Sequence, residues 1–186
     1  MQRAATIRRG LTLMEMLIVL ALLGILAALA LPHHQPAVTE QLRGTAEMIA
    51  ADIGYARSLA MMSNSRYRIT FDVPKQQYIL QHSGLNKALD TLPTDGFGSP
   101  SDPPDRRIGK LERFPSLATS VRLVGARAGG ATVNDVEFGP LGDPTRAAET
   151  VVWLTAGHGA AQRWMVLHIH PATGLVRLGE IQSTGP

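Results

Sequence analysis

Few side chains in this sequence are placed to do catalytic or metal chemistry. His168 and His170 are two residues apart in a strand-like segment, so both would point to the same face, a spacing found in metal sites. His33 and His34 are adjacent, which on a helix turns their side chains about 100° apart. His158 stands between two glycines without an evident nucleophile or acid as partner. With no cysteine and no third ligand at motif spacing, polar surface positions are the simpler interpretation.

The patterns of common catalytic sites are also missing. The sequence has no G-x-S-x-G turn, no Walker loop and no pair of carboxylates at motif spacing. We therefore expect no enzymatic activity, no cofactor and no metal.

One charged side chain has an unusual position. Glu15 lies inside an apolar segment, residues 11–31, which carries no other charge and is followed by Pro32. As a helix this segment would be about 31 Å long at ~1.5 Å per residue, which matches the ~30 Å hydrocarbon core of a bilayer. An acid within a membrane helix costs about 2.5–3.5 kcal/mol on insertion scales, and such residues usually have a partner. The sequence thus predicts a membrane helix whose acid meets a positive charge.

The residues around Glu15 resemble the signal of type IV prepilins. A short basic leader ends in Gly10, an apolar segment follows directly, and the acid stands five residues beyond that glycine. The resemblance implies cleavage between Gly10 and Leu11 by a prepilin peptidase on the cytoplasmic side, and N-methylation of Leu11 by the same peptidase/methyltransferase. Leu11 replaces the phenylalanine most common at this position in the family and keeps it apolar. Pilins also commonly place a helix-kinking proline where Pro32 stands, and Gly24 lies in the part of the helix that can loosen in filaments.

Processing of this kind gives Glu15 a partner. The cleaved chain has an α-amine at Leu11 that enters the bilayer with the helix, and opposite charges attract strongly at low dielectric. If Glu15 meets the amine of a neighbouring subunit, the pair sets the axial register of a helical bundle. The role of Glu15 is then in assembly.

Three other interpretations compete for this segment. An ordinary Sec signal has an apolar region with an A-x-A end, which Ala28-Leu29-Ala30 fits, but neither the acid nor the full span agrees with it. Arg8-Arg9 resembles a twin-arginine signal with poorly matching flanks. A plain single-span anchor explains neither Gly10 nor Glu15. The prepilin interpretation accounts for all of these features.

The charge balance says more about the membrane topology of the chain than about the ligands it binds. The chain has 18 Lys and Arg against 15 Asp and Glu, and three of the arginines are in the leader, so 15 of each remain after cleavage. The leader arginines hold the N-terminus in the cytoplasm by the positive-inside rule, which places the rest of the chain in the periplasm of a bacterium as a single-pass inner-membrane protein. The positive balance is therefore a leader effect and says little about nucleic acid, which is not expected as a partner.

Beyond the apolar segment, we expect one helix followed by strands. Apolar residues recur at helical spacing from Ala37 to about Met62, which predicts a helix packed on a sheet. Residues 83–110 are rich in Gly, Pro, Ser and Asp and predict a long exposed loop. Trp153, Trp164 and Phe138 are expected in the core. The expected strands are 66–72, 77–81, 120–125, 133–138, 150–155, 163–170 and 175–181.

The end of the chain adds a second resemblance. A strand ending in Phe138 before Gly142, and a closing hairpin with Thr173-Gly174-Leu175-Val176, resemble the globular domain of the GspH/FimT family of minor pilins and pseudopilins. This implies an α+β fold with a long N-terminal helix on antiparallel β-sheets. The implied division is a cleaved leader (1–10), a transmembrane and assembly half of the helix (11–31), its periplasmic half (32–62) and a globular domain (63–186).

The implied function is that of a minor pseudopilin of a type II secretion system, near the tip of a periplasmic pseudopilus that exports folded proteins. Its partners would be the major and minor pseudopilins, contacted through the N-terminal helix. The alternative is a FimT/FimU-like minor pilin, which acts in type IV pilus priming or DNA uptake. DNA-binding members are expected to carry a basic C-terminal tail, whereas residues 174–180 contain Arg177 and Glu180.

Overall fold

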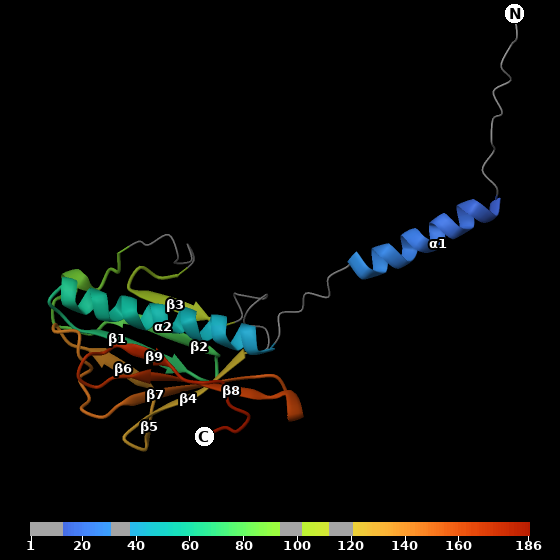
Figure 1. The fold of residues 1–186 in the computed structure, drawn as a ribbon. Coiled ribbons are helices and arrows are strands. Elements are labelled where there is room, and N and C mark those ends of the chain that lie inside the picture. The colour runs from blue at the N-terminus through green and yellow to red at the C-terminus, as the bar shows by residue number, and fades with distance from the viewer. Residues whose placement is uncertain (1–12, 31–37, 94–101, 112–120) are drawn as a thin grey trace, which may run out of the picture. The chain divides into compact units, whose positions relative to one another are not determined.

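The structure is a computed structural model that describes residues 13–30, 38–93, 102–111 and 121–186 (Figure 1). The chain divides into two compact units, 1–35 and 36–186. The first contains helix α1, Leu13–Ala30. The second contains helix α2, Val38–Met62, and two antiparallel sheets.

Helix α2 buries the stripe that its sequence predicts. Of the apolar residues at helical spacing in this segment, six are at most 1% exposed and Val38 is partly buried. The helix ends at Met62, and the chain turns away at Asn64, whose φ of 45° is left-handed, while the Ser65 amide donates to the Ala60 carbonyl at 3.0 Å. This is the usual way to satisfy the last carbonyls of a helix. The six buried residues are Leu42, Ala46, Ile49, Ile53, Ala56 and Ala60.

The first sheet has the strand order β3-β2-β1-β6. Strand β1 alternates buried and partly exposed residues, as its sequence predicts, with Tyr67, Ile69 and Phe71 buried. Strand β1 pairs with both β2 and β6. The strands are β1 Tyr67–Asp72, β2 Gln77–His82, β3 Arg106–Lys110 and β6 Asp135–Phe138.

The second sheet has the order β5-β4-β7-β8-β9. Gly129 and Gly130, both with positive φ, form the two-residue turn between β4 and β5, where glycine is strongly preferred. The short 3₁₀ turns η1 Lys87–Leu89 and η3 Gly159–Ala161 lie in connections. The strands are β4 Val121–Ala128, β5 Ala131–Val133, β7 Thr150–Ala156, β8 Arg163–Ile169 and β9 Val176–Leu178.

Helix α2 lies along both sheets and joins them into one core. It contacts β1 and β6 of the first sheet and β4, β7, β8 and β9 of the second, as Figure 1 shows. The buried side chains of the helix and of both sheets form a single hydrophobic cluster. The predicted α+β class with antiparallel sheets packed on a helix is confirmed.

Three expectations about the strands need correction. The predicted loop 83–110 contains η1 and also β3, which pairs with β2 through Ile79 and Ile108. Strand β3 is an edge strand with charged residues, so its sequence lacks the apolar alternation of a central strand. The single strand expected over 133–138 is two strands in different sheets, β5 and β6, divided at Asn134. The last strand is shorter than expected, Val176–Leu178.

The two tryptophans are also placed differently from expectation. Phe138 is fully buried in the core, as expected. Trp153 and Trp164 are partly exposed, because they alternate with the buried residues Leu154 and Met165 and so lie on the opposite face of the second sheet.

Candidate functional site

The first candidate site is the N-terminal segment. Glu15 lies in the first turn of α1, where a negative charge is favourable beside the unsatisfied amides of a helix start. The large apolar side chains from Leu13 to Ile25 are 44–79% exposed. Gly24 lies within α1, and nothing is within 4 Å of the place where a side chain would begin. Gly10, Leu11 and Pro32 lie outside the described residues.

Within the part of the chain that the structure describes, none of the helices combines the length and the apolar character needed to cross a membrane.

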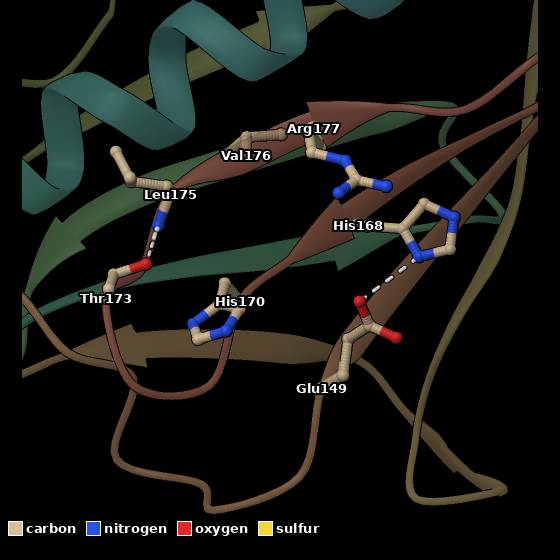
Figure 2. Close-up of a pocket in the computed structure, with 7 residues that line it drawn as sticks. All are labelled: Glu149, His168, His170, Thr173, Leu175, Val176 and Arg177. Carbon is tan, nitrogen blue, oxygen red and sulfur yellow. Dashed lines mark hydrogen bonds and ion pairs between the residues drawn. The ribbon is translucent and has the colours of Figure 1, made fainter.

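The second candidate site surrounds the two spaced histidines. A cavity of about 350 Å³ opens beside the hairpin between β8 and β9 (Figure 2). His168 lies 3.3 Å from a Glu149 oxygen through its Nδ1 atom. The His170 ring turns to its own hairpin and accepts from the Ala172 amide at 3.2 Å. The lining residues are Glu149, His168, His170, Thr173, Leu175, Val176 and Arg177.

This arrangement does not gather the histidines around a metal position. The two imidazoles make separate hydrogen bonds, one to a carboxylate and one to the backbone. No group of three His, Cys, Asp or Glu side chains among the described residues is placed to hold a metal ion. The cavity instead places Arg177 beside His168, its direct partner across the β8–β9 ladder.

Helix α2 holds the hairpin that borders this cavity. The Arg57 guanidinium Nε donates to the carbonyl of Thr173 at 2.8 Å and to the carbonyl of Gly142 at 3.1 Å. Two loops are therefore tied to the helix by one side chain. The sequence places Arg57 off the apolar stripe but gives no signal of these contacts, which span 85 and 116 residues.

A buried ionic cluster joins α2 to the edge of the first sheet. Asp52 is 8% exposed and accepts a 2.5 Å hydrogen bond from the Tyr78 hydroxyl. Its other oxygen is 2.8 Å from Arg107, whose guanidinium lies 5.5 Å from the centre of the Tyr55 ring. Burial, and then the Asp52 carboxylate, raise the pKa of the Tyr78 phenol far above its ordinary value, so the phenol stays protonated and donates. The cluster fixes β2 and β3 against the helix.

A second polar cluster brings together a serine, a histidine and an aspartate. Ser65 Oγ is 2.7 Å from Nε2 of His82, and Asp90 Oδ1 is 2.8 Å from Nδ1 of the same ring. The order of contacts is that of a nucleophile, a base and an orienting acid. The His82 side chain is fully buried, however, and Gly84 packs so closely that any side chain there would overlap Ser65 Oγ. Ser65 Oγ packs against Gly84 and is hydrogen-bonded to His82, so the cluster holds the segment after β2.

Comparison with known proteins identifies the N-terminal segment. Residues 6–31 match the prokaryotic N-terminal methylation motif. Among curated proteins, none matches the chain in sequence.

The chain is similar in fold to solved structures of a minor pseudopilin and of a type IV minor pilin. The minor pseudopilin EpsH from the Type 2 Secretion System of Vibrio cholerae superposes with a TM-score of 0.52 at 11% identity, over 74% of this chain and 95% of EpsH. The type IV minor pilin FimU of Pseudomonas aeruginosa gives a TM-score of 0.47 at 21% identity, over 75% of this chain and 88% of FimU. The N-terminal methylation motif and the fold shared with EpsH agree with the type IV pilin-like resemblance drawn from the sequence.

Proposed function

We propose that this protein is a minor pseudopilin of a type II secretion system, a low-copy structural subunit near the tip of the periplasmic pseudopilus. The observation that carries the proposal is the combination, in one chain, of the methylation motif at residues 6–31 with a globular fold shared with EpsH. Its partners would be the other major and minor pseudopilins and, before assembly, the prepilin peptidase/methyltransferase.

In this proposal the N-terminal segment has two successive roles. Residues 11–31 anchor the subunit in the bacterial inner membrane after cleavage at Gly10, and later form the core of the assembled helical bundle. Helix α1 supports this because it is apolar around its whole circumference apart from Glu15, and a helix of that kind needs lipid or other apolar helices around it. Residues 32–62 continue into the periplasm and carry the globular domain, 63–186.

Glu15 is proposed to meet the methylated amine of Leu11 in a neighbouring subunit. The test replaces Glu15 by Ala and measures both leader cleavage and recovery of the subunit in sheared pseudopilus fractions. We expect normal cleavage and reduced incorporation, because the register-setting charge pair is lost. Glu40→Ala, which removes an exposed acid from the first turn of α2, is the matched control and should incorporate normally. Unchanged incorporation of the Glu15 variant would contradict the pairing.

A genetic experiment distinguishes the proposed function from the alternative, a FimT/FimU-like minor pilin. Deletion of the gene should reduce export of folded proteins to the medium and leave pili and DNA uptake intact. Loss of piliation or of DNA uptake with normal secretion would favour the alternative and contradict the proposal.

A further inference from the structure

The outer face of the second sheet is the surface that none of the preceding functions uses. We define it by seven residues from four strands whose side chains alternate with the buried core residues. The surface contains both tryptophans of the chain, three arginines and no lysine. The seven residues are Arg122, Arg127, Val151, Trp153, Trp164, His168 and Arg177.

The strand register sets the arrangement of these side chains. Arg127 is opposite Val151, which is opposite His168, which is opposite Arg177. This row crosses four strands, and at about 4.8 Å per strand its two arginines are roughly 14 Å apart at the backbone. Arg122 is on the same strand as Arg127, and the β-bulge between Leu123 and Gly125 keeps it on the same face. Their partners on β7, Thr155 and Val151, are four residues apart, so the two arginines are roughly 13 Å apart at ~3.3 Å per residue. The arginines therefore mark three corners of the outer face.

The centre of the outer face is apolar. Trp153 is opposite Val166, and Trp164 is opposite Thr155, so the two indoles are diagonal neighbours on adjacent strands. Diagonal partners are about 7–8 Å apart, within reach of aromatic side chains. Gly185 of the C-terminal segment lies against the Trp164 ring, and both indoles are partly exposed.

Among the residues that the structure describes, none of the acids is a partner of the three corner arginines. Arg122, Arg127 and Arg177 are exposed, and within the described part of the chain no carboxylate forms an ion pair with any of them. Glu149, the acid that lines the cavity, has its carboxylate 3.3 Å from His168 Nδ1 and not against an arginine. The outer face is therefore cationic at its rim, with the cavity of Figure 2 at the Arg177 corner.

We propose that the outer face docks an acidic segment of another protein. A tryptophan-rich centre with arginines at the rim has the composition of protein–protein interfaces, in which Trp and Arg are enriched and Lys is depleted. Acidic side chains of the partner would pair with the corner arginines, Arg122, Arg127 and Arg177. Nucleic acid is less favoured, because the chain has a net charge of only +3 and the arginines are spaced around an apolar patch rather than along a track.

The two tryptophans provide the readout, because both are on the outer face. The full chain in mild detergent is titrated to millimolar concentration with the capped peptide Glu-Glu-Leu-Leu-Glu-Glu, and tryptophan fluorescence is recorded at low and high salt. We expect a saturable spectral change that weakens with salt. Arg127→Glu and Arg177→Glu should each weaken binding about fivefold, since each removes an attraction and adds a repulsion. Arg43→Glu on α2 is the charge-matched control and should bind normally.

Other results would overturn the proposal. These are no fluorescence change with the acidic peptide, equal binding of the peptide Lys-Lys-Leu-Leu-Lys-Lys, or unchanged affinity in both arginine variants. Tighter binding of oligothymidylate than of the acidic peptide would assign the outer face to nucleic acid instead. If a charge reversal perturbs folding by circular dichroism, Arg177→Gln replaces it, with about a threefold loss expected. The outcome is independent of whether the subunit serves secretion or a pilus.

Discussion

Removing one hydroxyl from the buried ionic cluster tests how the globular unit is held together. Tyr78→Phe deletes the donor of the 2.5 Å hydrogen bond to Asp52 and leaves the ring in place. The Tyr78 ring lies directly over Gly109 of β3, where any side chain would overlap it. The ring is thus held by the sheet, and the substitution removes little besides the hydrogen bond.

The expected magnitude follows from the charge of the acceptor. Hydrogen bonds to charged groups contribute about 1.5–3 kcal/mol, more than neutral ones, and Asp52 is nearly excluded from water. For a domain of this size each kcal/mol shifts the melting temperature by about 2–4 °C. We therefore expect Tyr78→Phe to lower the free energy of unfolding by about 1.5–3 kcal/mol and the melting temperature by about 3–12 °C.

Urea and thermal unfolding, followed by circular dichroism, measure this effect. Tyr67→Phe is the matched control, because Tyr67 is equally buried but its hydroxyl is 3.4 Å from the neutral Ser63. The control should lose less than about 1 kcal/mol. If Tyr78→Phe costs no more than Tyr67→Phe, the cluster does not stabilise the unit and the reasoning is refuted.

Two further predictions concern glycine and pH. Gly109→Ala should lower the free energy of unfolding by about 1–3 kcal/mol in urea unfolding, because its methyl group meets the Tyr78 ring; Gly54→Ala, in open space on α2, should raise it by about 1 kcal/mol. The hydrogen bond from His82 lowers the pKa of the Asp90 carboxyl below its value in the unfolded chain, about 3.9. The interaction therefore stabilises the fold fully above that pH, and this stabilisation is lost as pH falls through the lower pKa of the folded state. Asp90→Asn should therefore lower the melting temperature at neutral pH, with a difference that shrinks below pH ~4; an equal difference at both pH values would contradict this assignment.

The sequence predicted best where burial imposes a simple period. The stripe from Leu42 to Ala60 repeats every three to four residues because one side of α2 faces the core. Strand β1 was predicted equally well, because Tyr67, Ile69 and Phe71 alternate with polar residues.

The rest depended on contacts that no local pattern encodes. Asp52 occupies a buried position of α2 only because Arg107 and Tyr78, far along the chain, reach it. Strand β3 was not predicted, because the composition of residues 83–110 is typical of a loop. Trp153 and Trp164 were expected in the core, but in β7 and β8 they alternate with the buried residues and so lie on the outer face of the second sheet. A strand's two faces can be told apart only when its neighbours identify which one is buried.

The central claim is that this chain is processed as a prepilin and keeps its apolar helix. Intact-mass measurement and N-terminal sequencing of the protein extracted from its membrane test this directly. We expect a mature chain that begins at Leu11 and carries a methylated amino group. A chain that begins at Met1, or one that has lost the apolar segment and begins near Leu31 or His33, would contradict the account.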